Sequence, residues 1–200
     1  VVDDASDASD ADADDAVRCP SVLWSDEFDS PRDSLDLSKW EPMIGTGVDY
    51  YGPQGEGWGN DELQHYLAEN AAVSNGTLKI VARKEQRSVR FSGSGYTSAR
   101  LRTKNLGGEF LHGRFEARIK IPTGRGMWPA FWMLPTEEIS GGWPGSGEID
   151  IMESIGSEPR AVHGSIHYGL PKPDNSYKVG SLTLPGTDGG TDAASASASA

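Results

Sequence analysis

The segment from Gly147 to Gly156, Gly-Glu-Ile-Asp-Ile-Met-Glu-Ser-Ile-Gly, constrains the fold of this 200-residue chain more than any other. It interleaves three acids with apolar side chains. A helix would turn Glu148 and Glu153 about 140° apart, whereas a strand places Glu148 and Asp150 on one face. A regular strand would turn Glu153 to the other face, but one extra residue in a bulge near Met152 returns it. The segment therefore predicts a bulged strand with three acids on one face.

Three neighbouring carboxyls resist joint ionisation, so one of them keeps its proton near neutral pH. A protonated acid opposite an ionised carboxylate is the arrangement used in glycoside hydrolysis. One group protonates the leaving oxygen, and the other attacks the anomeric carbon or activates water. A solvated edge-strand face and a cation site are the alternatives. Acids among isoleucines on a half-buried strand are costly unless they are used, which favours the catalytic interpretation.

Composition points to an all-β protein. The 25 glycines and 12 prolines are scattered among short apolar runs, which is typical of a sandwich with many turns. The net charge of −12 argues against nucleic-acid binding, and no apolar run approaches the ~20 residues that span a membrane. We therefore expect a soluble protein that binds neither. Cys19 is the single cysteine, which excludes an internal disulfide.

The chain divides into three parts. Residues 1–17 hold seven aspartates and no basic residue, so we expect a disordered acidic leader. It has no basic and apolar signal-peptide regions, and we expect any signal peptide to be absent from this chain. Residues 18–185 form the expected globular domain, and residues 186–200 a low-complexity tail of Thr-Asp-Gly-Gly and alternating Ala-Ser.

Several segments predict local structure. Asn75-Gly76, between the apolar runs of 72–83, predicts a hairpin with a two-residue type I′ turn. Residues 23–29 predict a strand, residues 37–40 a short turn of helix, and residues 113–122 a strand with one wet face. Residues 161–168 also predict a strand. Its two histidines would then lie roughly 13 Å apart, too far to share one metal ion.

Aromatic side chains gather near the acids in sequence. On a strand, Trp128 and Trp132 share one face with a small alanine between them, which gives an apolar platform about two sugar rings long. A buried core position is the alternative for these indoles. The Gly-rich turn before the acidic strand could place Trp143 at the mouth of a cleft. Asn60 lies in a segment of mixed aromatic and amide groups that suits sugar contacts.

These motifs together resemble glycoside hydrolase family 16. The acidic strand has the bulged form E-x-D-x-x-E of laminarinases, and similar blocks are W-G-N-D-E-L-Q (58–64), Y-T-S-A-R-L (96–101), M-W-P-A-F-W-M-L-P (127–135) and V-H-G-S-I-H-Y (162–168). The resemblance covers about residues 20–178. It implies a jelly-roll β-sandwich with a concave substrate cleft. It also implies retaining endo-hydrolysis of β-1,3-glucosidic bonds in β-glucans such as laminarin, by a secreted, monomeric enzyme that requires no cofactor.

The resemblance also implies residue roles. Glu148 would be the nucleophile, Glu153 the general acid and then base, and Asp150 the partner that tunes the nucleophile. His167 would lie beside the acid as a helper. The substrate-binding residues would be Asn60, Arg100, Trp128, Trp132 and Trp143. Arg100 as a solvated ion pair and Asn60 in a plain polar loop are the alternatives.

A structural calcium ion is a further implication of the resemblance. Glu27 and the Gly76 carbonyl would contribute to it. The family takes a further ligand from an aspartate near its C-terminus, and no matching residue is visible here. Calcium therefore stays an expectation with an incomplete ligand set.

The end of the chain departs from the family. Relatives continue through several more strands, including a Phe-His-x-Tyr and Glu-Trp stretch, so we expect this domain to lack C-terminal strands. Three alternatives follow. The chain is a hydrolase of another polysaccharide (mixed-linkage glucan, agar or carrageenan), a non-catalytic β-glucan-binding protein, or an inactive fragment.

Overall fold

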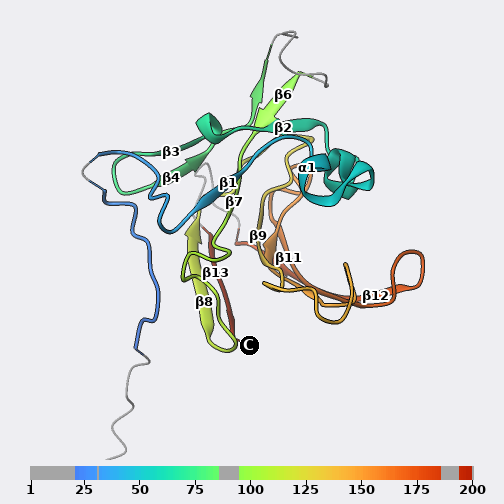
Figure 1. Cartoon of the computed structure of the whole chain (residues 1–200). Helices are drawn as coiled ribbons and strands as arrows, with labels where there is room; N and C mark the ends of the chain where they lie inside the picture. Colours follow the sequence, from blue (N-terminus) through green and yellow to red (C-terminus); the bar gives the residue numbers. More distant parts are fainter. Residues whose placement is uncertain (1–20, 31, 86–94, 186–193, 200) are drawn as a thin grey trace, which may run out of the picture.

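The computed structural model describes residues 21–30, 32–85, 95–185 and 194–199. The predicted acidic leader, Cys19 and most of the predicted tail lie outside the described residues. The elements run β1 (Glu41–Met43), α1 (Val48–Tyr51), η1 (Pro53–Gly59), β2 (Gln64–Tyr66), η2 (Ala68–Asn70), β3 (Ala71–Val73), β4 (Leu78–Ile80), β5 (Arg83–Lys84), β6 (Tyr96–Ser98), β7 (Arg100–Arg102), β8 (Arg114–Ile119), β9 (Ala130–Met133), β10 (Glu148–Glu153), β11 (Ala161–Gly169), β12 (Asn175–Thr183) and β13 (Ala194–Ser199) (Figure 1). Within the described part of the chain, no helix has the length and apolar character needed to cross a membrane.

The strands form one larger sheet and several small ones. The larger sheet is antiparallel, in the order β12-β11-β10-β9, and the acid-bearing strand β10 is internal to it. A three-stranded sheet has the order β2-β6-β5, and β1 pairs with β7, β3 with β4 and β13 with β8. An internal strand has neighbours on both sides, so both β9 and β11 can supply side chains to the acids of β10.

The bulge predicted in the acidic strand is present. Asp150 lies opposite Ser165 of β11 and Glu153 lies opposite His163, so three steps along β10 span two steps along β11. Against β9 the register also shifts, between Asp150 and Met152. The extra residue reverses the alternation of faces for the residues that follow it. Spacing alone thus predicted the bulge correctly.

The hairpin of residues 72–83 is also confirmed. β3 and β4 pair antiparallel, and Val73 lies opposite Leu78. Asn75 and Gly76 both have positive φ, 52° and 62°, and the Ser74 N–H donates to the Thr77 carbonyl. Two consecutive left-handed residues define a type I′ turn, which is why Asn-Gly favours it.

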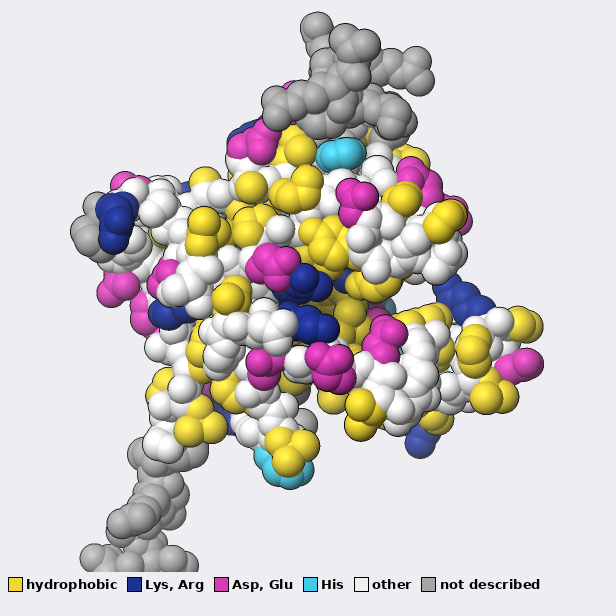
Figure 2. Space-filling model, viewed as in Figure 1, with side chains coloured by type: hydrophobic (Ala, Val, Ile, Leu, Met, Phe, Trp, Pro, Cys, Tyr) yellow, Lys and Arg dark blue, Asp and Glu magenta, His cyan; other side chains and the backbone are white. Residues whose placement is uncertain are grey.

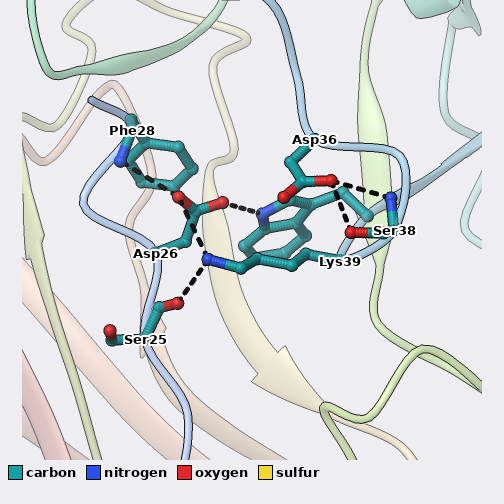
Figure 3. Close-up of polar contacts among 7 residues, drawn as sticks. Ser25, Asp26, Phe28, Asp36, Ser38 and Lys39 are labelled. Atoms are coloured by element: carbon teal, nitrogen blue, oxygen red, sulfur yellow. Dashed lines mark hydrogen bonds and ion pairs between the residues drawn. The ribbon is translucent and has the colours of Figure 1, made fainter. Parts of the chain in front are cut away.

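The strand predicted for residues 23–29 is wrong, because this segment is irregular in the structure. Figure 3 shows the cause: the Asp26 carboxylate accepts the Phe28 backbone N–H at 3.0 Å and the Trp40 indole N–H at 2.8 Å. Phe28 takes a positive φ of 55°, which ends an extended path. An aspartate that binds its own backbone competes with strand pairing. The predicted helical turn is confirmed, since the Trp40 N–H donates to the Asp36 carbonyl.

The alternation of charged and apolar residues predicted a strand with one solvent-exposed face. β8 confirms this, since exposed and half-buried side chains alternate along Arg114–Ile119. Its partner in the described chain is β13, the alternating Ala-Ser segment, in a continuous six-pair register. On the larger sheet, β12 is largely exposed and includes Tyr177, Val179 and Leu182. Much apolar surface of this sheet therefore remains in contact with solvent.

Asn70 provides a test of the fold. This side chain is fully buried and donates to the Val81 carbonyl at 2.7 Å and to Thr97 Oγ at 3.0 Å, which joins η2 to β6. Asn70→Ala leaves both acceptors without this donor and should cost about 1–3 kcal/mol of unfolding free energy. Urea unfolding measures the loss, with the exposed Lys79→Ala as control. Equal stability of Asn70→Ala and the control would contradict this assignment.

Candidate active site

The three acids of β10 are the centre of the site. Asp150 is buried, with 4% of its surface exposed, and Glu148 and Glu153 are partly exposed. Each glutamate accepts a hydrogen bond from an indole. Trp143 Nε1 donates to Glu148 Oε2 at 2.7 Å, and Trp128 Nε1 donates to Glu153 Oε1 at 2.9 Å. The bulge thus gives two glutamates, each with its own indole donor, on either side of a buried aspartate.

β11 covers Asp150 with two further polar groups. His167 Nε2 lies 3.2 Å from Asp150 Oδ2, as expected for the predicted helper. Ser165 Oγ donates to the same oxygen and lies 3.3 Å from His167 Nε2 and 3.4 Å from Glu153 Oε2. Ser165 was not among the site residues predicted from the sequence. The available signal was its position two residues before His167, on the same face of the predicted strand.

Burial and mutual repulsion raise the proton affinity of the glutamates. Burial, followed by the Asp150 carboxylate, raises the pKa of Glu148 to about 7, although the Trp143 hydrogen bond opposes this. Glu148 also shares a hydrogen bond with Asp150, which raises the pKa of Glu148 further. Burial and Asp150 likewise raise the pKa of Glu153, against the Trp128 and Ser165 hydrogen bonds. The site therefore keeps protons that isolated carboxyls would lose.

The predicted sugar-binding residues separate into two groups. The first surrounds Arg100, whose guanidinium lies between two indoles, 4.5 Å from the Trp58 ring and 4.6 Å from the Trp132 ring. Trp58 is buried and also contacts the rings of Tyr50 and Tyr66. Arg100 is thus held in an aromatic stack, and Trp58 is a further member of this group that the sequence analysis did not select.

The second group lies beside the acids. Trp128, 53% exposed, and Trp143 place their indole N–H groups on the two glutamates. The Trp143 ring contacts His167 at 5.8 Å, and His167 stacks on Tyr177 of β12 at 5.7 Å. These rings form an aromatic border next to Glu148. Figure 2 shows a hollow near the middle of the viewed face, with hydrophobic side chains inside it and charged side chains around it.

Asn60 is exposed at the C-terminal end of η1, two residues after Trp58. Its backbone N–H donates to the Gly57 carbonyl. Its proposed contact with sugar stays a prediction. Glu62, two residues further on, accepts hydrogen bonds from Gln64 Nε2 and Tyr66 Oη, which is a structural role.

Two places bear on metal binding. Glu148, Asp150 and His167 each bring one donor atom within 4.8 Å of the others. The two carboxyls of this cluster already accept hydrogen bonds, Glu148 from Trp143 and Asp150 from Ser165. At the expected calcium position, a Cβ built on Gly76 would lie 3.9 Å from the Glu27 carbonyl oxygen, so the two expected residues are neighbours. Calcium binding there stays a prediction.

The raised pKa of Glu148 predicts a stability change with pH. The folded state binds more protons than the unfolded chain between the ordinary value of 4.5 and about 7, so this group destabilises the fold progressively as pH rises through that window. Glu148→Gln cannot ionise and should melt at a higher temperature than the parent at pH 8, with a smaller difference at pH 5. Calorimetry at both values measures this. A difference that is constant or larger at pH 5 would contradict the shift.

Comparisons with known proteins identify the relatives of this chain. The model of the family described as glycosyl hydrolases family 16 matches residues 61–180. The beta-glucanase of Rhodothermus marinus is 46% identical over 151 residues, which are 73% of this chain and 48% of that protein. Glucan endo-1,3-beta-glucosidase A1 of Niallia circulans is 39% identical over 182 residues, which are 86% of this chain and 25% of that protein. The chain thus spans less than half the length of these two relatives.

A solved structure gives the same relationship. The laminarinase catalytic domain of Thermotoga maritima matches with a TM-score of 0.75 and 40% identity, over 88% of this chain and 68% of that chain. The expected all-β fold, a jelly-roll β-sandwich, is thereby confirmed. The family match covers more than half of the chain, including the bulged strand and the strands on either side of it. The chain belongs to glycosyl hydrolase family 16.

Proposed function

We propose that this chain is a retaining endo-β-1,3-glucanase that hydrolyses β-glucans such as laminarin. The observation that carries the proposal is the trio of acids on β10, in which the bulge returns Glu153 to the face of Glu148 and Asp150. The two relatives above and the Thermotoga maritima domain, named as glucanases or a laminarinase, support this substrate class.

In the first step, Glu153 donates its proton to the glycosidic oxygen while Glu148 attacks the anomeric carbon. The carbon–oxygen bond to the leaving sugar breaks, and a bond to the Glu148 carboxylate forms. The raised pKa of Glu153 favours its protonated form more than that of an isolated glutamate, as a proton donor requires. Glu148 must be ionised at this moment, and the Trp143 indole N–H that donates to it favours this ionised form.

In the second step, the Glu153 carboxylate removes a proton from water, and the water oxygen attacks the anomeric carbon. Glu148 leaves as a carboxylate, so two inversions give net retention. The indole N–H of Trp143 donates to Glu148 and stabilises the departing charge. The indole N–H of Trp128 does the same for Glu153 after it has lost its proton. Each glutamate thus has a donor matched to its ionised form.

The substrate is an extended β-glucan, and the aromatic group around Arg100 is proposed to bind glucosyl units beyond the cleaved bond. Indole faces stack on the apolar faces of pyranose rings, and a guanidinium donates to hydroxyl groups. A polymer of this kind cannot pass through a cell envelope, so the proposal includes action outside the cell. The chemistry uses only carboxyls and water and requires no cofactor. We propose a monomer as the active form.

Of the alternatives, a non-catalytic glucan-binding protein is not favoured, because all three acids are present with their donors. Hydrolysis of another polysaccharide is tested by a substrate panel. Laminarin, mixed-linkage glucan, agar and carrageenan should rank with laminarin first.

Replacing either glutamate should abolish turnover. Glu148→Gln and Glu153→Gln should each lower the release of reducing ends from laminarin by at least about 100-fold, because one loses the nucleophile and the other the proton donor. Glu116→Gln, an exposed glutamate of β8, is the matched control and should keep full activity. Parental activity in either site variant would refute the assignment.

Azide separates the two roles. In Glu148→Ala, azide can occupy the emptied nucleophile position and should give an α-glycosyl azide from a β-glucoside with a reactive aryl leaving group. In Glu153→Ala, Glu148 still forms the intermediate, and azide should capture it as the β-glycosyl azide. NMR of the products distinguishes the anomers. The opposite pairing of variant and anomer would show that the roles are exchanged.

A further inference from the structure

Ser165 of β11 contacts both Asp150, the partner of the proposed nucleophile, and Glu153, the proposed proton donor. It is 9% exposed and lies opposite Asp150 in the register of the sheet. Its hydroxyl donates to Asp150 Oδ2, and its oxygen lies 3.4 Å from Glu153 Oε2. The bulge produces this position, because it brings Asp150 and Glu153 to the same face beside one hydroxyl. A serine has a single O–H, so it can donate to only one of these two carboxyls at a time.

We propose that Ser165 is a positioning residue that couples the proton donor Glu153 to the Glu148–Asp150 pair by turning its hydroxyl from Asp150 to Glu153. The inference rests on the proposed function and deepens it. Only the hydrogen turns, by rotation about the Cβ–Oγ bond, and the serine neither gains nor loses a proton. Asp150 already accepts the hydroxyl, and Glu153 Oε2, 3.4 Å from the same oxygen, must move closer as it gains charge.

The coupling follows from where charge develops. While Glu153 holds its proton, Ser165 donates to Asp150 rather than to Glu153. As Glu153 passes its proton to the glycosidic oxygen, negative charge grows on its carboxyl and attracts the hydroxyl. Asp150 then loses the donor from Ser165 and is freed to strengthen the hydrogen bond that it shares with Glu148. The Glu148–Asp150 contact thus changes at the step in which Glu148 attacks.

The side chains around Ser165 limit which other group could donate to both Asp150 and Glu153. The titratable groups around the hydroxyl come from three strands. Glu148, Asp150 and Glu153 lie on β10, and His163, opposite Glu153, and His167 lie on β11. Tyr177 of β12 stacks on His167. His167 Nε2 also faces Asp150 Oδ2, so it can support the aspartate. Trp128 and Trp143 donate to one glutamate each. Among these described neighbours, Ser165 is the donor within reach of both Asp150 and Glu153.

Ser165→Ala tests the proposal through turnover. It should lower kcat on laminarin by about 10- to 100-fold, the effect of losing one hydrogen bond to a charged group, and change KM little because the sugar-binding side chains stay in place. The hydroxyl lowers the pKa of Glu153, so its loss should move the alkaline limb of the kcat/KM profile to higher pH. Ser165→Thr keeps the hydroxyl and should recover both properties.

Ser181→Ala is the matched control. This exposed residue of β12 also makes a hydroxyl–imidazole contact, at 2.8 Å between its Oγ and His163 Nδ1, in place of the carboxyl contacts that Ser165 makes. It should leave kcat and the pH profile unchanged. Should Ser165→Ala fail to fold, as judged by its thermal melt, Ser165→Cys keeps the volume, loses the strong donor and carries the same expectation.

The outcomes are distinct. Ser165→Ala with parental kcat and an unmoved alkaline limb would overturn the inference, as would a folded Ser165→Thr that is as slow as Ser165→Ala. A parent chain that hydrolyses no glucan would instead refute the proposed function. In that case ¹³C NMR titration of the glutamate carboxyls still tests the contact, since Ser165→Ala should raise the pKa of Glu153 without any substrate. An unchanged titration would exclude the coupling.

Discussion

The extra residue in β10 between Asp150 and Met152 is the constraint on which the site depends. Without it, the strand would alternate regularly and Glu153 would turn away from Glu148. With it, three carboxyls share one face of an internal strand, where β9 and β11 fix their positions through backbone pairing. The geometry of the acids is therefore a property of the sheet rather than of a loop, which suits chemistry that requires fixed distances.

Crowded carboxyls are tolerated here because each has its own donor. Trp128, in the segment before β9, donates to Glu153, and Trp143, in the turn before β10, donates to Glu148. Ser165 of β11 donates to Asp150. Burial nevertheless raises the pKa of both glutamates, so the site holds protons near neutral pH. This balance between unfavourable burial and specific donors is what gives ordinary carboxyls the separate acid and nucleophile roles proposed here.

The sequence predicted those features that depend on local pattern. The spacing of Glu148, Asp150 and Glu153 predicted the bulge, and Asn75-Gly76 predicted the turn, because alternation and positive φ are encoded within a few residues. Ser165 and the stacking of Arg100 between two indoles depend on register between distant strands, which no single segment encodes. The strand predicted for residues 23–29 failed because Asp26 binds its own backbone there.

The stereochemistry of hydrolysis tests the central claim most directly, because it depends on both glutamates acting from one bulged strand. Proton NMR can follow the anomeric signals in the first minutes of hydrolysis of a β-1,3-linked glucose hexamer, before the anomers interconvert. The account predicts that the new reducing end appears first as the β-anomer and then equilibrates with the α-anomer. Initial release of the α-anomer would show inversion and would contradict the role assigned to Glu148.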